Sequence, residues 1–249
     1  MDKAKKNEVI RAAAGRMAEI YKEAEIPLYG DAQRMPSRDT VIEIIRDCQK
    51  LFFPVYYGNR DLLKLPPEQY SALLMEHIHE KLTAQIALTM SECEENDARA
   101  YDIASDFVAR LPAIQEMLLK DLAANFDGDP AAYSMEEVLL SYPGMFAIFI
   151  YRIAHELYAR KVAMIPRMMS EYAHSQTGID INPGVRRHPK VGNNVVLYAN
   201  STLLGGATEI GDNVIVGGNA FLTSSVEPDT IVSVTTPELT VRGKRREEE

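Results

Sequence analysis

Histidine exchanges a proton close to neutral pH, which suits it to acid–base chemistry, and the chain contains five. His77 and His79 stand two apart in a stretch of helical periodicity, so their side chains face different directions and make a poor metal or catalytic pair. His155 opens the run HELYA, in which Ala159 stands where a zinc-binding HExxH helix has its second His. We expect these three histidines to be surface or packing residues.

The other two histidines lie near the point where the composition of the chain changes. We expect His174 to cap or pack at the junction of the two regions. His188 lies in the run RHP, which is often only a corner of the chain, and Asp180 precedes Ile181, where an Asp is often only a cap. These structural interpretations stand beside a chemical one, for which His188 is the one histidine left.

Cysteine and charge content restrict the class of protein. Cys48 and Cys93 both lie in segments of helical pattern, so neither a disulfide framework nor a cysteine metal site is indicated, and we expect a cytoplasmic location. The net charge of −9 argues against nucleic acid or an acidic membrane as a partner. The longest apolar run, Gly144–Ile150, is far shorter than the roughly 18 residues of a membrane span.

The elements that must position such side chains differ between the two parts of the chain. Residues 1–174 carry apolar residues at three- and four-residue spacing, which predicts an all-α domain. One helix is expected to start at Pro36–Ser37 and stop at Pro54, and the next to start at Pro66–Pro67. The run SMEE at Ser134–Glu137 predicts a capping box, in which the Ser hydroxyl and the Glu side chain satisfy each other's backbone amides.

After Thr177 the helical pattern ends, and nine of the 14 glycines fall between Gly178 and Gly243. Aliphatic residues now recur at steps of six or seven: Val191, Leu197, Leu203, Ile210, Val216 and Leu222. This hexapeptide repeat predicts a parallel β-helix, in which one apolar residue per short strand points into a narrow prism and small residues turn the corners. An antiparallel meander would instead show alternation with a period of two. We therefore predict an α+β fold, with a β-helix over residues 175–236 and a charged tail over 237–249.

Several stretches of the sequence carry a resemblance to a known family. They are DGDPAA at Asp127–Ala132, YRIAHELY at Tyr151–Tyr158, SEYAHSQTGIDINPG at Ser170–Gly184, RHPKVGNNV at Arg187–Val195 and IGDNVIVGGNAFLTSSV at Ile210–Val226. In these stretches the chain resembles bacterial serine O-acetyltransferases. The resemblance implies an all-α N-terminal domain followed by a left-handed β-helix, and transfer of an acetyl group from acetyl-CoA to the side-chain hydroxyl of L-serine.

The resemblance also assigns roles to residues. A serine hydroxyl is a poor nucleophile at neutral pH, so a His must take its proton while a carboxylate orients the imidazole. By resemblance His188 is the active-site His, Asp180 the orienting carboxylate, Arg187 a contact to the serine carboxylate and Asp129 the residue that binds the serine ammonium.

The CoA groove is implied to run along Ala199 and the glycine-rich turns around Gly205 and Gly218. In relatives the active site lies between neighbouring β-helices, which implies a homotrimer or a hexamer of two trimers. No metal is implied. Many relatives end in an Ile that binds the cysteine synthase partner, O-acetylserine sulfhydrylase, whereas this chain ends in Glu249, so we do not expect that complex.

One departure from the family pattern falls between Gly184 and Val185. In the family DI.PG is followed by further hexads, including an Asp-His pair that supplies the general base, before the RHP turn. Here the run INPG continues directly into VRRHP, and hexapeptide counting indicates that about 40 residues are absent. Asn182, where relatives often have His, cannot replace the base. We therefore expect this chain to be impaired in acetyl transfer. Either it is an internally deleted version, or the native protein contains the missing segment between Gly184 and Val185.

Other classes of function were weighed against this one. Another hexapeptide O-acetyltransferase, acting on a sugar or antibiotic hydroxyl, would usually lack the helical domain with Asp129. A γ-type carbonic anhydrase needs three histidines as zinc ligands, and the repeat region has one. A catalytically inactive, oligomeric relative is the non-enzyme alternative. Serine binding without turnover would identify it.

Overall fold

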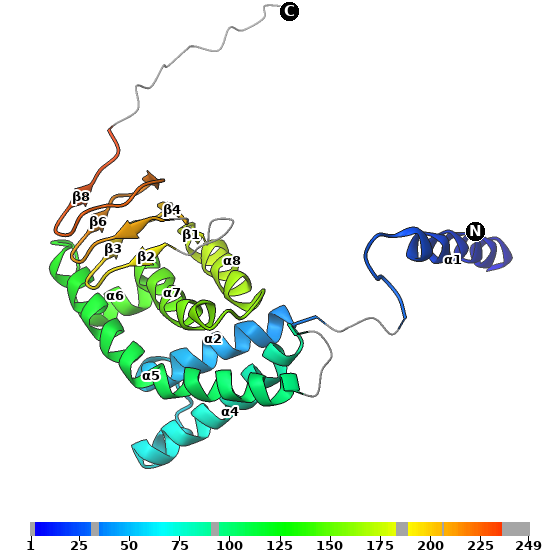
Figure 1. The fold of residues 1–249 in the computed structure, drawn as a ribbon, viewed down its shortest axis with the longest axis horizontal. Helices are drawn as coiled ribbons and strands as arrows, with labels where there is room; N and C mark the ends of the chain where they lie inside the picture. The colour runs from blue at the N-terminus through cyan, green and yellow to red at the C-terminus, as the bar shows by residue number, and fades with distance from the viewer. Residues whose placement is uncertain (1–2, 31–34, 91–94, 183–188, 206, 236–249) are drawn as a thin grey trace, which may run out of the picture. The chain divides into compact units, whose positions relative to one another are not determined.

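A computed structural model describes residues 3–30, 35–90, 95–182, 189–205 and 207–235 (Figure 1). The chain divides into two compact units, Met1–Met35 and Pro36–Glu249. The described residues of the first unit include the helix α1 (Lys3–Glu23), and the rings of Tyr21 and Tyr29 stack with their centroids 5.9 Å apart.

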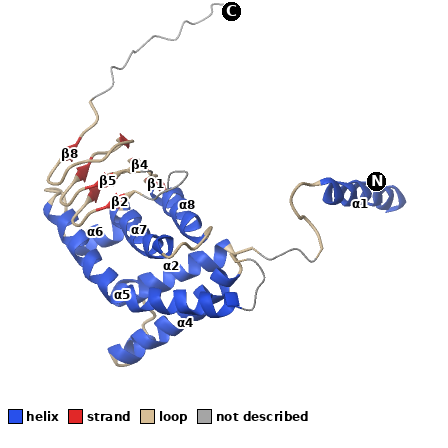
Figure 2. Ribbon diagram, in the orientation of Figure 1, coloured by secondary structure: helices blue, strands red, loops and turns tan. Residues whose placement is uncertain are grey.

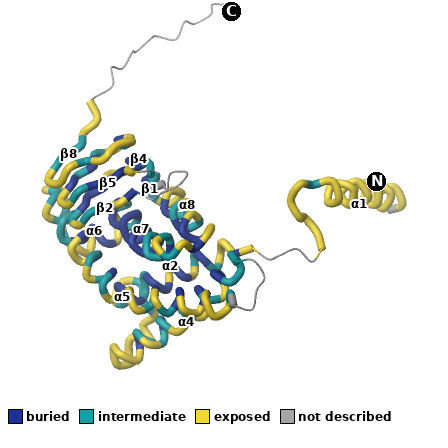
Figure 3. The backbone as a smooth tube through the Cα atoms, in the orientation of Figure 1, coloured by how far each residue is buried: buried dark blue, intermediate teal, exposed yellow. Residues whose placement is uncertain are grey.

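The second unit begins with an all-α region, as predicted (Figure 2). Its helices are α2 (Arg38–Phe52), α3 (Pro54–Tyr57), α4 (Pro67–Ala87), α5 (Glu95–Asp127), α6 (Met135–Ser141), α7 (Pro143–Ala159) and α8 (Ile165–Thr177), with a 3-10 turn, η1 (Leu62–Lys64). Figure 3 shows the buried faces of these helices turned toward one another. Fully buried side chains such as Ile44, Ile78, Phe107 and Ile148 fill the space between them.

The predicted helix starts are confirmed. Ser37 caps α2 by accepting a hydrogen bond from the Thr40 amide, and Pro67 is the first residue of α4. The capping box of α6 is only half formed. Ser134 Oγ accepts from the Glu137 amide at 3.1 Å, but the Glu137 carboxylate accepts from the Tyr133 amide and not from Ser134. The carboxylate therefore satisfies the amide of the residue before the cap.

None of the described helices is by itself long and apolar enough to span a membrane. Helices α6 and α7 satisfy the length and composition requirement only as a pair, and they meet at a bend of 72°.

The strands form a triangular prism of short parallel sheets. They are β1 (Asp180–Asn182), β2 (Lys190–Val191), β3 (Val196–Leu197), β4 (Thr202–Leu204), β5 (Glu209–Ile210), β6 (Ile215–Val216), β7 (Phe221–Leu222) and β8 (Ile231–Val232). One face has the order β1-β4-β7, the second β2-β5 and the third β3-β6-β8. The aliphatic residues of the hexapeptide repeat stack inside: Leu203 pairs with Leu222, Val191 with Ile210 and Leu197 with Val216.

The register of the sheets shows that the prism closes across the departure from the family pattern. Asp180 pairs with Thr202, 22 positions later, and Thr202 pairs with Phe221, 19 positions later. The first coil is thus only three residues longer than the second, and Ile181 still stacks on Leu203. Strand β1 therefore pairs in register with β4, in a chain whose sequence lacks the family coils expected to follow Gly184 in relatives.

Asparagine and aspartate side chains hold the corners of successive coils together. Asn194, Asn213 and Asp229 follow one another at a single corner, each with a φ near +58°. Asn194 donates to Asn213 at 2.9 Å, and Asn213 donates to Asp229 at 2.7 Å. Short polar side chains tolerate the left-handed conformation and hydrogen-bond locally, which explains their use at these turns.

Helix α7 fixes the first strand of the second face through backbone contacts. The Tyr151 hydroxyl donates to the Pro189 carbonyl at 2.9 Å and accepts from the Val191 amide at 3.0 Å. These bonds satisfy an edge of the first coil, which a short solenoid would otherwise leave unpaired.

A buried ion pair completes this junction. The Arg152 guanidinium donates to both carboxylate oxygens of Asp121 on α5, at 3.0 and 3.1 Å. The same guanidinium donates to the carbonyls of Val191 and Gly192 at 2.9 and 2.7 Å. Burial raises the pKa of the Asp121 carboxyl, while Arg152 opposes the rise. The helical region and the prism are therefore joined by a fully paired charge.

Candidate active site

A pocket of about 340 Å³ lies where the bend between α6 and α7 meets the prism. Strand β3 and the corner that follows it form the opposite wall. The lining residues are Asn125, Asp129, Ser141, Tyr142, Pro143, Gly144, Val196, Leu197, Tyr198 and Ala199. Two residues assigned to different substrates by resemblance, Asp129 and Ala199, therefore line one pocket.

Asp129 is held in place from two sides. Its Oδ1 accepts from the Ala131 amide at 2.9 Å, and its Oδ2 accepts from the Tyr142 hydroxyl at 2.7 Å. The Ala131 amide and then the Tyr142 hydroxyl hold the pKa of the Asp129 carboxyl below its usual value, so it stays ionised. The same hydrogen bond raises the pKa of Tyr142 to about 12, so the phenol remains a donor.

Ala199 and Gly218 lie at the same corner of successive coils. The Asn219 amide donates to the Ala199 carbonyl at 3.2 Å, and a Cβ on Gly218 would lie 3.2 Å from the same carbonyl oxygen. Gly205 lies elsewhere, after β4, where its carbonyl accepts from Thr208 Oγ1. The structure thus brings Ala199 and Gly218 together and leaves Gly205 at the far end of the intervening strand.

Asp180 begins β1, and its amide donates to the Ser201 carbonyl at 2.9 Å. Because Ile181 points into the prism, the partly exposed Asp180 side chain lies on the outside. Asp180 does not line the pocket. Arg187 and His188 lie outside the described residues.

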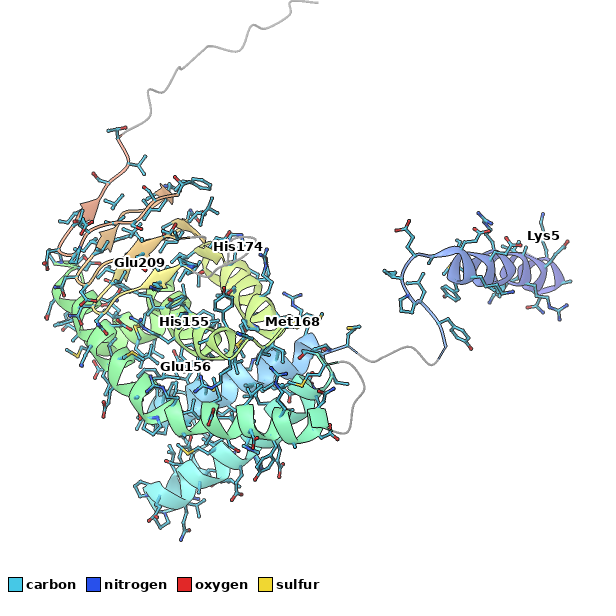
Figure 4. All side chains as sticks on the ribbon, viewed as in Figure 1. Lys5, His155, Glu156, Met168, His174 and Glu209 are labelled. Carbon is cyan, nitrogen blue, oxygen red and sulfur yellow. The ribbon has the colours of Figure 1, made fainter. Side chains whose placement is uncertain are left out.

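None of the other histidines, all of which the structure describes, lines the pocket. His77 is exposed, and His79 packs against the edge of Tyr101 and hydrogen-bonds Ser105 Oγ at 2.9 Å. His155 and His174 are labelled in Figure 4. His155 lies on α7, and burial lowers its pKa. It is separated from the pocket by about 16 Å of helix, since 11 residues follow Gly144 at ~1.5 Å each.

His174 is exposed on α8, and only its carbonyl contributes to the cap of that helix, by accepting from the Gly178 amide at 2.9 Å. Within the described ranges there is also no group of three or more His, Cys, Asp or Glu side chains that could hold a metal ion. Cys48 is buried and free, and Cys93 lies outside the described residues.

Sequence reasoning missed Tyr142, Tyr151 and Arg152. A signal for Arg152 existed, because it is the one charged residue in the otherwise apolar run from Gly144 to Ala154 and is now seen buried. A charged side chain on a buried helix face calls for a partner. The partners of Tyr142 and Tyr151 lie on other elements, so nothing in the local pattern identifies them.

Comparison with known proteins places the chain in a family. A family model described as serine acetyltransferase, N-terminal, matches residues 69–149. The serine acetyltransferase of Helicobacter pylori is 42% identical over 140 residues, which cover 39% of this chain and 81% of that protein. The chain belongs to the serine acetyltransferase family. A plasmid serine acetyltransferase of Synechococcus elongatus is 29% identical over 262 residues and covers 80% of this chain and 82% of that protein.

Solved structures of this family share the fold. Serine acetyltransferase isoform 3 of Entamoeba histolytica, in complex with cysteine, superposes with a TM-score of 0.59 at 21% identity and covers 96% of both chains. Serine acetyltransferase 1 of the same organism, in complex with L-cysteine, gives 0.58 at 20% identity and covers 92% of this chain and 100% of that one. The predicted α+β fold, an all-α domain followed by a left-handed parallel β-helix, is confirmed.

The alignment with the Helicobacter pylori serine acetyltransferase is longer than the part of this chain that it uses. It runs over 140 positions, whereas 39% of 249 residues is about 97. About 43 of its positions therefore have no counterpart in this chain. Where along the chain they fall is not fixed by these numbers.

Proposed function

We propose that this serine acetyltransferase binds L-serine and acetyl-CoA in the pocket at the bend between α6 and α7, and that the chain as it stands transfers acetyl groups slowly. The observation that carries the proposal is the shared pocket. Asp129, from the helical region, and Ala199, from a corner of the β-helix, line the same 340 Å³ space. An amine site and a thioester site must adjoin for acetyl transfer to a nearby hydroxyl.

The serine end of the pocket is assigned to Asp129 and Arg187. An ionised Asp129, with its orientation set by two donors, is suited to accept hydrogen bonds from an ammonium group. Arg187 is assigned to the carboxylate of serine, because a guanidinium binds a carboxylate through two parallel hydrogen bonds.

Acetyl-CoA is assigned to the corner at Ala199 and Gly218. A Cβ at Gly218 would lie 3.2 Å from the Ala199 carbonyl oxygen, so glycine lets the two coils approach closely at that corner. Gly205 is assigned to the more distant part of the same groove. No role for a metal is proposed.

The step that we expect to be slow in this chain is removal of the proton from the serine hydroxyl. His188 is the proposed proton acceptor and Asp180 its orienting carboxylate, since none of the histidines in the described ranges lines the pocket. The Asp-His pair that the resemblance implies after Gly184 is missing from the sequence. General-base catalysis contributes roughly 10²–10⁴-fold to such reactions, and we expect a deficit of that order.

A homotrimer is proposed as the working assembly. Three apolar side chains on the outside of the prism support it: Tyr198 is 39% exposed, Phe221 65% and Ile231 71%. The absence of a complex with cysteine synthase stays a prediction, as does the cytoplasmic location.

The test is release of the CoA thiol, measured at steady state with L-serine and acetyl-CoA. Three proteins are compared: this chain, the variant His188→Ala, and a variant with about two family coils, carrying the Asp-His pair, inserted between Gly184 and Val185. We expect the insertion to raise kcat by roughly 10²–10⁴-fold and His188→Ala to remove the residual rate of this chain. Equal rates with and without the insertion would overturn the impairment. No serine-dependent thiol release by the insertion variant would overturn the function.

A further inference from the structure

Helix α1 carries an apolar stripe that the described part of its own unit does not cover. Every residue of α1 from Ala4 to Glu23 is exposed (Figure 3). At about 100° of rotation per residue, all five large apolar side chains of the helix fall within an arc of about 120°. They are Val9, Ile10, Met17, Ile20 and Tyr21, and their exposed fractions run from 37% for Tyr21 to 57% for Val9. Helices of soluble proteins bury such a stripe against another element.

The stripe follows the spacing of a coiled coil. Alternating steps of three and four separate Ile10, Ala13, Met17, Ile20 and Ala24. These steps are the a and d positions of a heptad repeat, which pack against the same positions of another helix. Lys6 takes the next position of the seam on the N-terminal side, so the apolar part is about two heptads long.

The residues beside the seam favour parallel packing of copies of α1. If two copies ran antiparallel with Ile10 against Ile20, Arg16 of one copy would lie beside Arg16 of the other, and like charges repel. In a parallel pair Arg16 instead lies beside Tyr21 of the neighbouring copy, where a guanidinium and an aromatic ring attract. Helices that meet on the axis of a cyclic oligomer also run parallel.

The short seam limits how strongly α1 can associate. Isolated helices shorter than about 12–15 residues are marginal in water, and two heptads are of that length. Chains that are already joined elsewhere hold their copies of α1 at an effective concentration on the order of millimolar. Under that condition a weak seam adds stability to an existing assembly.

We propose that α1 is a self-association segment, in which three copies of the helix pack in parallel along the stripe from Val9 to Ala24. The number three rests on the homotrimer of the proposed function, whereas the parallel contact of α1 with itself rests on the stripe. The helix lies outside residues 69–149, which the family model matches. The contact is therefore distinct from the site assigned to serine and acetyl-CoA.

Disulfide crosslinking of the full chain tests which face of α1 meets another copy. Met17→Cys places a thiol on the seam, and Lys22→Cys places one on the opposite face of the same helix. Both are made in the background of Cys93→Ser, since Cys48 is buried. At micromolar protein and with copper phenanthroline as oxidant, Met17→Cys should form linked dimers at least about tenfold faster than Lys22→Cys. Equal rates would overturn the proposal.

The same chemistry tests the direction of packing. In the antiparallel arrangement Met17 would face Ala13 of the other copy. A mixture of Met17→Cys and Ala13→Cys would then form the mixed dimer, while Met17→Cys alone would form none. That result would overturn parallel packing, and linkage of Met17→Cys with itself supports it.

Sedimentation velocity over a dilution series measures what α1 contributes to the assembly. Ile20→Asp places a charge in the seam, and Ala18→Asp adds the same charge to an exposed position outside it. We expect Ile20→Asp to raise the concentration at which the trimer dissociates by about tenfold or more, since burial of one Ile is worth at least that factor in an association constant. Ala18→Asp should leave it unchanged. Equal dissociation of the two variants would overturn the contribution of the seam.

Thiol release separates this inference from the proposed function. If Met17→Cys crosslinks but the insertion variant releases no thiol with L-serine and acetyl-CoA, the function fails and self-association stands. If the insertion variant turns over and Met17→Cys does not crosslink, the function stands and self-association is overturned. Cosedimentation of the wild-type chain with phosphatidylglycerol vesicles, without crosslinking of Met17→Cys, would assign the stripe to a lipid surface and overturn the proposal.

Discussion

Removal of one partner of the ion pair between Arg152 and Asp121 should strongly destabilise the second unit. Arg152 is 7% exposed and Asp121 fully buried, and together they join α5, α7 and the first coil. In Arg152→Met the apolar stem is retained, but the Asp121 carboxylate loses its partner in a dry environment. Removal of one partner of a buried pair costs about 3–5 kcal/mol.

That loss is large compared with the total stability of a domain, which is about 5–15 kcal/mol. In a domain of this size each kcal/mol of lost stability lowers Tm by about 2–4 °C, so Arg152→Met should lower Tm by about 6–20 °C.

The effect of Arg152→Met on stability should also depend on pH, in a direction that the pKa of Asp121 determines. Burial already raises the pKa of Asp121, and without Arg152 it should rise further. A raised carboxyl pKa makes the folded state bind protons more tightly, so the deficit should shrink as pH falls through it.

Urea unfolding at pH 7.5 and 5.5 measures both effects. Arg110→Met is the matched control, since Arg110 is 48% exposed and pairs with Glu156 at 3.3 Å, and should lose less than about 1 kcal/mol. Adding Asp121→Asn to Arg152→Met should recover about half of the loss, because the uncompensated charge disappears. The reasoning is wrong if Arg152→Met costs no more than Arg110→Met, or if the second substitution recovers nothing.

Three further predictions concern single residues. Gly144→Ala should cost about 1–3 kcal/mol in urea unfolding, because the added methyl would meet the Leu197 carbonyl, and an unchanged midpoint would contradict this contact. Met164→Gly should raise stability by about 1 kcal/mol, since Met164 has a φ of +60° and is 45% exposed, and a lower Tm would show that its side chain matters more. Burial lowers the pKa of His155 in the folded state below its ordinary value of 6.5. As pH falls below 6.5, the unfolded state therefore binds a proton at this residue before the folded state does. Stability is lost with falling pH until the pKa of the folded state is reached. His155→Phe should flatten that slope between pH 7 and 5, and an unchanged slope would assign it to other groups.

The repeat could be predicted from the sequence because its period is geometric. A residue such as Leu203 points inward wherever strands of two or three residues follow one another around three faces, so spacing alone identifies it. Closure of the first coil could not be predicted in this way. Hexapeptide counting detects absent residues, but only the pairing of Asp180 with Thr202 shows that the remaining strands still meet in register.

The contacts within the candidate site likewise could not be predicted from sequence patterns. Asp129 and Ala199 were assigned by resemblance, and the pocket that they share depends on how α5 and α7 pack on β3. Tyr142 is 13 residues from Asp129 along the chain, on the other side of α6, so no helical or strand spacing connects them. Contacts of this kind become visible only once the helices are placed.

The way in which α7 holds strand β2 bears on how far the sequence of that strand can change. The hydrogen bonds of Tyr151 and Arg152 to this strand involve backbone atoms: the carbonyls of Pro189, Val191 and Gly192 and the amide of Val191. These hydrogen bonds therefore do not depend on which side chains the hexad carries. We therefore expect the contact between α7 and the β-helix to persist when exposed side chains of this hexad, such as Lys190, are substituted.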